Sequence, residues 1–455
     1  MSPDPIGASG AGHDLSSAAP VAGGPLPVGH AFATMSLTRE HVKAGSALFF
    51  AFVIEAWEML IVSYVSSSIR ADFHIGAAAV GLLLSSMYFG MIPGALLWGA
   101  VTDRIGRKMT CIWSLAGYGF CCAASALAPN YWSFCAARFC SGFALAGILV
   151  AVFVYFEELL PVRHRGRATV FLAGGWPIGT LIAVGVTAGV VNTLGWRAVI
   201  LISALSGLWA LLIWRWVPES PYWLVTKGRQ AEARAAIERL SRGQVDTTRE
   251  LYVPVGPRSS ARALFQGRAT KITLLQVVVN FALSWGYWGL QTWLPNLLAD
   301  RGLSLPASYL FITVSALSMI PGYLSAAWLT ARYGRRRIYL SYVFLGTAGG
   351  LLFAFAPSMA FLYAGNVMMS IFAQGSWGVW DTWMAEVYET HNRGRGYSLG
   401  IAAQRVANAI APGVIGLFVS YAFGFTSTVA FIEAFFVVAL VLALPLPETE
   451  GEELT

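Results

Sequence analysis

The sequence predicts an all-α membrane protein, with twelve transmembrane helices arranged as two pseudo-symmetric six-helix bundles. Of its 455 residues, 56% are hydrophobic and only 12% are charged. A soluble domain carries about twice that share of charge, so a water-soluble enzyme built around one core is excluded. Twelve spans of about 21 residues each would use about 250 positions, which is close to the hydrophobic content.

An internal repeat predicts the two bundles. Four short landmarks each recur further along the chain, all by the separation between Met91 and Met319, which we call the repeat offset. One fixed offset across four landmarks indicates two halves of similar fold. The landmarks are MIPG (91–94 and 319–322), the basic loop at 103–108 and 331–336, Ala-Pro (128–129 and 356–357), and a Glu followed by Arg-Gly-Arg (158 with 165–167, and 386 with 393–395).

The repeat and the polar stretches divide the chain into five parts. The first 35 residues contain no Lys or Arg and are rich in Gly, Ala, Pro and Ser, so they are not typical of a signal or transit peptide. We expect a disordered cytoplasmic tail over 1–43, a six-helix bundle over 44–217, a cytoplasmic linker with short surface helices over 218–270, a second bundle over 271–446, and an acidic tail over 447–455.

The basic residues predict the orientation. With both chain ends in the cytoplasm, 25 of the 30 Lys and Arg face the cytoplasm, three face outside and two lie within spans. Loops rich in Lys and Arg stay inside, so this topology explains the net charge of +7 without nucleic acid. We expect a monomeric integral protein of the plasma membrane, in bacteria the inner membrane, whose partners are the lipid bilayer, a small-molecule substrate and protons.

Several kinds of chemistry have no sequence signal. The five cysteines lie inside apolar runs and are interpreted as small hydrophobic residues. We find no metal-ligand spacing, no Ser/His/Asp arrangement and no phosphate-binding loop of the form GxxxxGK[ST]. We therefore expect no cofactor, no bound metal, no enzymatic activity and no ATP-driven transport.

Three loop motifs resemble the major facilitator superfamily. They are GAVTDRIGRK at 99–108, EELLPVRHRGR at 157–167 and PESPYWL at 218–224. The last is similar to the PESPRWL motif of sugar porters, with Tyr222 in place of the usual Arg. The resemblance extends over nearly all of 44–446. It implies the major facilitator fold and a secondary transporter that works by alternating access around a central site.

Three further segments resemble one group within that superfamily, the aromatic-acid:proton symporters and the niacin-transporter or synaptic-vesicle-2-like proteins. They are EAWE at 55–58, GYWGLQTWLP at 286–295 and AQRVANAIAP at 403–412. The resemblance implies proton-coupled uptake of a small organic anion, an aromatic or heterocyclic carboxylate. A proton-coupled antiporter that exports organic cations or drugs is the main alternative. A sugar:proton symporter and a non-transporting sensor stay open as well.

Ionisable residues inside the predicted spans are the first candidates for function, because charge is costly in lipid. There are six: Glu55, Glu58, Arg138, Asp381, Arg405 and Glu433. The four acids outnumber the two bases, so at least one acid is expected to take up a proton. By helix rise, Glu58 and Arg138 lie roughly 18 and 21 Å from the cytoplasmic face and could meet.

The resemblance supports the same pair, since proton-coupled sugar porters pair an acid of helix 1 with the Arg of helix 4. We expect Glu58, Glu55 and Arg138 to couple protons; the alternative is a static ion pair. Glu433 lies in helix 12, which the resemblance places at the periphery, so we expect no direct role for it.

The predicted substrate site combines one cation with many aromatic rings. A guanidinium suits a carboxylate, and aromatic walls suit a planar ring or a cation. The alternatives are that Arg405 pairs with Asp381, which lies at a similar depth, and that several Trp residues belong to the interfacial belt. In the superfamily, helices 1, 4, 7 and 10 line the cavity. The candidates are Arg405, Trp57, Tyr287, Trp288, Gln291, Gln374, Trp377, Trp380 and Asp381.

The resemblance also implies a gate. In the superfamily the loop between helices 2 and 3 forms a charge-relay lock with nearby helix ends on the cytoplasmic side, which favours the outward-open state. The residues at these positions are Asp103, Arg104, Gly106, Arg107, Glu158 and Arg165, together with Glu386 and Arg393 from the second half.

Overall fold

A computed structural model describes residues 24–254, 261–388 and 393–449. The first half contains β1 (Leu26–Pro27), α1 (Val28–Thr34), α2 (Arg39–Phe73), α3 (Ala77–Ile105), α4 (Arg107–Ala126), α5 (Tyr131–Glu158), α6 (Arg165–Ala173), α7 (Gly175–Ala204) and α8 (Trp209–Trp216). The linker forms α9 (Pro221–Thr226), α10 (Gln230–Ser241) and β2 (Leu251–Tyr252). The second half contains α11 (Gly267–Asp300), α12 (Leu305–Tyr333), α13 (Arg335–Ala354), α14 (Met359–Glu386), α15 (Arg393–Ser420) and α16 (Gly424–Ala443). Short 3₁₀ turns lie at Val162–His164, Leu205–Leu208 and Ala261–Phe265.

Nine helical stretches of the described chain are long and apolar enough to cross a membrane. One of them, Phe171–Trp216, has 46 residues and contains a break at Gly195, whose φ is +78°. A positive φ suits glycine, and the break divides this stretch into two crossings. With α11 and α14, which have 34 and 28 residues, the described chain has the twelve crossings that its hydrophobic content predicts.

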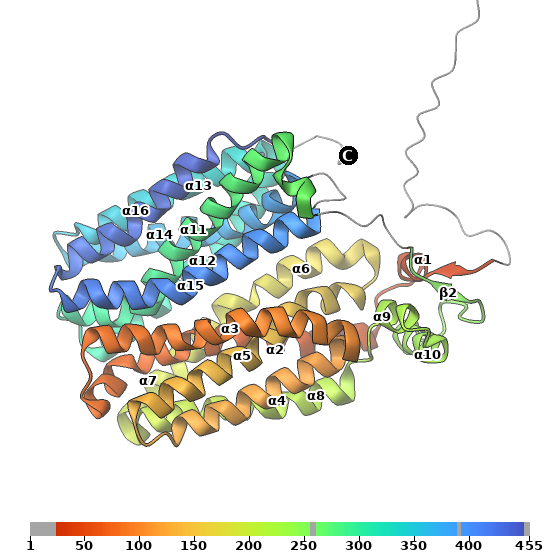
Figure 1. Ribbon diagram of the computed structural model, residues 1–455, viewed down its shortest axis with the longest axis horizontal. Helices are drawn as coiled ribbons and strands as arrows, with labels where there is room; N and C mark the ends of the chain where they lie inside the picture. The colour runs from red at the N-terminus through yellow and green to blue at the C-terminus, as the bar shows by residue number, and fades with distance from the viewer. Residues whose placement is uncertain (1–23, 255–260, 389–392, 450–455) are drawn as a thin grey trace, which may run out of the picture.

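The two halves are copies of one design. Helices α3, α4 and α5 correspond to α12, α13 and α14, whose first and last residues all lie one repeat offset later in the chain. The breaks between consecutive helices repeat as well, since Gly106 and Gly334 have φ values of +94° and +91°. Figure 1 shows the halves as two separate helical bundles. The repeat predicted from the sequence is therefore confirmed.

One end of the bundles, which we call the tail face, carries α1, α9 and α10 (Figure 1). The opposite end, the far face, is where the halves meet. There α3 packs on α15 so closely that a side chain at Gly81 would collide with the backbone of Pro412. The Tyr309 hydroxyl also donates to the carbonyl of Tyr64 at 3.2 Å. We infer that the structure is closed at the far face.

The segment before α2 folds as a strap over the first half, defined here as residues 24–38. β1 pairs in parallel with β2, and the Thr38 hydroxyl donates to the carbonyl of Leu240 at 2.6 Å. Phe32 is fully buried and stacks on Tyr222. The prediction of disorder over 1–43 is therefore wrong for 24–43, because apolar side chains within this stretch find a surface to bury against; residues 1–23 lie outside the described residues.

Candidate functional site

A buried polar cluster lies inside the first half, around Glu58. The Tyr118 hydroxyl donates a hydrogen bond to Glu58 Oε2, and Ser203 lies close to this carboxyl group. Glu58 and Arg138 are each only 1% exposed. The cluster joins helices α2, α4, α5 and α7, so the protein encloses it away from the seam between the halves.

Arg138 interacts electrostatically with Glu58, but the two side chains form no ion pair within 4 Å. The Arg138 guanidinium instead donates to the sulfur of Met87 at 2.7 Å and to that of Cys122 at 3.7 Å. Tyr118 interacts electrostatically with both charges. The predicted pair is thus one cluster in which a hydroxyl group holds the acid and two soft sulfur atoms hold the base.

Arg405 lies at the second ionisable centre, between the halves. It interacts electrostatically with Glu55 of the first half and with Asp381 of the second. Neither acid comes within ion-pair distance of it, and both Arg405 Nε and Glu55 Oε2 are buried without a hydrogen-bond partner among the described residues. Asp381 is exposed although it lies within α14. The direct Asp381–Arg405 pair considered above is therefore not formed.

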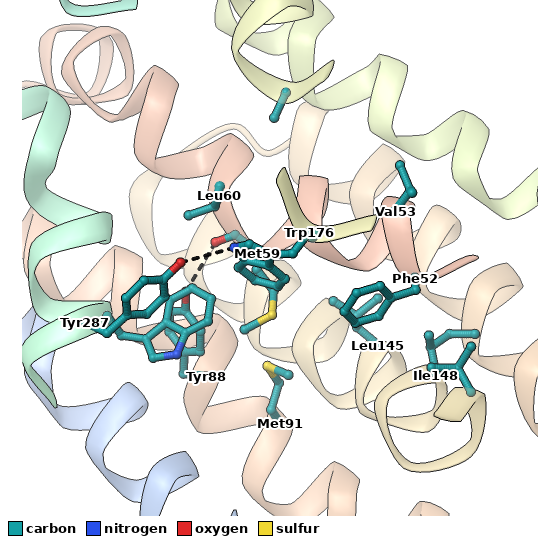
Figure 2. Close-up of a cluster of buried hydrophobic side chains, with 14 of the residues drawn as sticks. Phe52, Val53, Met59, Leu60, Tyr88, Met91, Leu145, Ile148, Trp176 and Tyr287 are labelled. Carbon is teal, nitrogen blue, oxygen red and sulfur yellow. Dashed lines mark hydrogen bonds between the residues drawn. The ribbon is translucent and has the colours of Figure 1, made fainter. Parts of the chain in front are cut away.

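Aromatic side chains from both halves meet beside this centre. The Trp176 indole N–H donates to the Tyr287 hydroxyl at 3.1 Å, which connects α7 to α11. Trp288 packs edge-on against Trp176 and at a tilt against Tyr88, with ring centroids 5.4 and 5.5 Å apart. Trp377 lies edge-on to Tyr287 at 5.9 Å. Figure 2 shows Tyr287 pointing across from α11 toward Trp176 and Tyr88.

Polar atoms without partners lie near these rings. Gln374 donates to the Tyr323 hydroxyl at 2.5 Å, but its Oε1 atom is buried and unpaired among the described residues, as is Nε1 of Trp377. Gln291 is half-buried on α11. Buried polar groups usually have partners, so unpaired donors and acceptors beside aromatic faces are what a site for a polar planar ligand would provide.

Two predicted cavity residues are placed elsewhere. Trp57 donates to the Ser203 hydroxyl at 2.9 Å and so faces the interior of the first half. Trp380 is fully buried and donates to Asn280 at 3.0 Å inside the second half. Trp380 follows Trp377 by three residues, a step that turns a helix by about 300°, which is enough to direct Trp380 into the bundle.

The predicted gate residues form two matching salt bridges at the tail face. Arg107 contacts Glu158, with Nε 3.2 Å from Oε2, and Arg335 contacts Glu386 through two bonds of 2.9 and 3.0 Å. Arg107 also lies 3.8 Å from Asp103, whereas the second half has Ala331 there. Each salt bridge stays within one half, so in this conformation neither locks the halves together.

Two acids outside the predicted set lie beside these salt bridges. Glu219 accepts hydrogen bonds from the backbone N–H groups of Arg107 and Lys108, at 3.0 and 3.1 Å, and Glu448 does the same for Arg335 and Arg336 in the second half, at 2.8 and 3.3 Å. A carboxylate at a helix N-terminus is stabilising. Burial nevertheless raises the pKa of Glu219, while its backbone hydrogen bonds act in the opposite direction.

The remaining gate residues have different surroundings. Gly106 forms the break before α4, and Arg104 is exposed. Arg165 donates to the Tyr222 hydroxyl at 2.9 Å, whereas Nε and one terminal nitrogen of Arg393 have no hydrogen-bond partner among the described residues. In this conformation Arg165 contacts Tyr222 and Phe32 of the strap, while Glu158 is contacted by Arg107.

Comparison with known families now identifies the fold. The family model described as "Major Facilitator Superfamily" matches residues 46–329 and 277–455. The chain belongs to the major facilitator superfamily. This membership, with the spans above, makes it an integral membrane transporter and not an enzyme.

Known members of the superfamily are similar along most of their length. A niacin transporter of Acinetobacter baylyi is 30% identical over 407 residues, covering 88% of this chain and 93% of the relative. A putative niacin/nicotinamide transporter of Bacillus subtilis is 27% identical over 402 residues, covering 88% and 93%, respectively. A synaptic vesicle 2-related protein of Bos taurus is 27% identical over 402 residues, covering 80% and 70%. The xylose transporter XylE of E. coli, in a partially occluded inward-open conformation, superposes with a TM-score of 0.73 at 18% identity, covering 92% of this chain and 100% of that one.

Sequence reasoning missed several residues of this transporter's site. Arg335 lies one repeat offset after Arg107, and Glu386 lies at the same offset after Glu158, so the repeat alone could have found the second salt bridge. Trp176, Tyr88 and Tyr118 had no comparable signal. They lie in ordinary apolar runs, and only the tertiary packing brings them to the acids and to the other rings.

Proposed function

We propose that this transporter is a proton-coupled symporter that imports a small aromatic or heterocyclic carboxylate. The observation that carries the proposal is Arg405, a guanidinium between the halves that has two acids near it and no direct salt bridge to either. The niacin transporters among its relatives make nicotinate, a pyridine carboxylate, the first substrate to test.

Arg405 would bind the substrate carboxylate. A carboxylate entering a low-dielectric site needs a fixed cation, or its desolvation is not offset. Glu55 and Asp381 interact electrostatically with Arg405, while its Nε has no hydrogen-bond partner among the described residues. A bidentate carboxylate would complete the donor fork that neither acid occupies.

The aromatic cluster would bind the ring. Trp288, Tyr287 and Trp377 present faces and edges to one another, with centroids 5.4 and 5.9 Å apart. Offset and edge-to-face contacts with such rings stabilise a planar ligand. The unpaired Nε1 of Trp377 could donate to a ring nitrogen or to a carboxylate oxygen.

The Glu58 cluster would bind the proton. In this conformation Glu58 accepts from Tyr118 and forms no ion pair with Arg138, which is the arrangement expected when the acid is neutral. Loss of the proton would draw the carboxylate toward Arg138. This change would alter the packing of α2 against α4 and α5, and α2 also carries Glu55 to the substrate site. Protonation and substrate binding would thereby favour the same rearrangement.

The direction of transport follows from the orientation. The charge distribution favours a cytoplasmic tail face. With the tail face in the cytoplasm, the contacts that close the far face correspond to an inward-facing state. Import requires the far face to open while the tail face closes, with the two gates as the moving contacts. In bacteria the transporter would operate in the inner membrane.

Uptake by the purified full-length transporter in proteoliposomes tests the proposal. Uptake of labelled nicotinate should rise with an inward proton gradient and collapse with an uncoupler, and protein-free liposomes serve as the control. Benzoate should compete and a quaternary amine should not. Uptake that ignores the gradient would reject proton coupling. Competition by the amine alone would instead support the antiporter of organic cations, for which Glu55 and Asp381 would be the binding acids.

A further inference from the structure

The second half contains a buried carboxyl group that the proposed cycle does not use. Glu433 lies in the middle of α16 and is fully buried. Both of its carboxyl oxygens lack a hydrogen-bond partner among the described residues. A charged carboxylate without a partner is strongly unfavourable in a protein interior and in a membrane, so this group requires an explanation.

The helices around Glu433 offer it no compensating charge. α16 packs on α11, α13 and, less extensively, α15. No described charged side chain of these helices interacts electrostatically with Glu433. Their described charged residues lie near the tail face, at the far end of α11 or at the central site: Lys271, Asp300, Arg335, Arg336, Arg337, Arg393, Arg395 and Arg405.

The space for the carboxyl group is created by a glycine of α13. A side chain at Gly350 would collide with the carboxyl carbon and both oxygens of Glu433. Gly350 lies one repeat offset after Cys122, which contacts Arg138 in the first half. The Glu433 carboxyl group therefore occupies the region of the second half that corresponds to the Glu58 cluster of the first half.

The rest of that cluster has polar but uncharged counterparts. Arg138 and Met87, which are bonded to each other, correspond at the same offset to Asn366 and Ser315. These two are bonded as well, with Asn366 Nδ2 donating to the Ser315 hydroxyl at 2.6 Å. Asn366 Oδ1 is buried and has no partner among the described residues. An unpaired acceptor thus accompanies the unpaired acid.

We propose that Glu433 is a second proton-binding site, which holds a resident proton and stays neutral throughout the transport cycle. The counterpart of Glu58 is Gly286, so α11 supplies no acid at the equivalent position. The acid comes from α16 instead. The acceptor that we assign to its carboxyl O–H is Oδ1 of Asn366, the unpaired acceptor at the position equivalent to Arg138. The site lies within the second half and has no exposure, so its proton is not exchanged at each turnover. Its role is to hold α16 against α13, and deprotonation separates them.

Alkaline stability of the full-length transporter in nanodiscs tests this inference. The unfolding temperature of the wild type should fall as the pH rises into the alkaline range, because unfolding releases the proton that Glu433 holds in the folded state. Glu433→Gln, which is neutral at every pH, should lose that fall. Glu238→Gln, the same substitution at an exposed site on α10, should keep it. Identical alkaline profiles for the wild type and Glu433→Gln would overturn the proposal.

Two further variants keep the test decisive. Glu433→Leu installs the residue of the equivalent position in the first half, Leu205, and should also give a flat alkaline profile, so the question stays answerable if the Gln variant folds poorly. Asn366→Ala removes the acceptor, so Glu433 should ionise more readily in the folded state and the fall should level off at a lower pH. A fall that levels off at the wild-type pH would contradict the assigned partner. Glu433→Gln should also leave the number of protons carried per substrate unchanged, and a lower number would show that this proton is exchanged. The alkaline stability readout is independent of substrate identity, so it is separable from failure of the proposed function.

Discussion

The two halves of this transporter agree at the tail face and differ in the membrane. At the tail face each half has an Arg–Glu salt bridge, Arg107 with Glu158 and Arg335 with Glu386. Each half also has an acid that accepts hydrogen bonds at a helix N-terminus: Glu219 does so at α4, and Glu448 does so at α13. The gate thus has the same geometry in both copies, even though the second half has Ala331 in place of Asp103.

The six ionisable residues that lie within the spans are not duplicated. Each one corresponds, at the repeat offset, to a side chain without charge. Glu55, Glu58, Arg138, Asp381, Arg405 and Glu433 correspond to Leu283, Gly286, Asn366, Phe153, Pro177 and Leu205. The difference teaches that the tail-face salt bridges are shared by both halves, whereas each charge that we propose to bind a proton or an anion occurs once.

The largest expected effect is on the unduplicated acid of the first half. Glu58→Gln should abolish proton-driven accumulation and keep exchange of preloaded substrate, because the amide mimics the protonated acid and cannot release a proton. Accumulation and counterflow in proteoliposomes measure the two activities. Accumulation at the wild-type level would show that Glu55 or Asp381 couples the proton instead.

Glu55→Gln is the matched control on the same helix. Glu55 interacts with Arg405 and not with the Tyr118 cluster, so its loss should change the affinity for substrate while some gradient-driven accumulation persists. If the two variants behaved alike, the separation of the proton site from the anion site would be wrong.

A smaller effect is expected at the duplicated gate. Arg107→Ala and Arg335→Ala each break a partly buried salt bridge, which should cost about 1–2 kcal/mol, between the values for exposed and buried pairs. Because the bridges lie in different halves, the double variant should be additive within about 0.5 kcal/mol. Thermal unfolding measures this. Strong non-additivity would mean that the gates couple to each other directly.

The smallest effect is expected at the strap, residues 24–38. Tyr222→Phe removes the hydrogen bond to Arg165, a loss of about 1 kcal/mol, and should speed hydrogen exchange over 26–38 while transport is unaffected. Tyr252→Phe, at an exposed position on β2, is the control. Unchanged exchange in Tyr222→Phe would show that stacking on Phe32 alone holds the strap.

The fold could be predicted because lipid imposes strong rules on sequence. Twelve apolar spans and the fixed offset defined both bundles, and the offset pairs Arg107 with Arg335 as surely as the structure does. The strap could not be predicted, because its burial depends on Tyr222, which replaces an Arg in the PESPRWL pattern, and on a parallel strand pair that only the tertiary fold creates.

The candidate site could be predicted in its charges and only partly in its aromatics. Charges in spans are rare enough to be noticed singly, which is how Glu55, Arg138 and Arg405 were found. Tryptophans are common, and their direction depends on helix rotation, which spacing alone fixes poorly. Trp377 therefore reaches the site, while Trp380 turns into the second half to bond Asn280.

The central claim is that Arg405 binds the substrate carboxylate, and a double-variant cycle tests it most directly. Nicotinate binding to the purified transporter should weaken about 100-fold in Arg405→Ala, since losing one partner of a buried charge contact costs about 3 kcal/mol. Arg405→Lys should weaken it less, because the charge stays while the planar fork is lost. In the double variant Arg405→Ala with Asp381→Asn, the stability lost in Arg405→Ala should recover, whereas the affinity for nicotinate should not. Recovery of affinity in that double variant would contradict the account, because Arg405 would then serve only to neutralise Asp381.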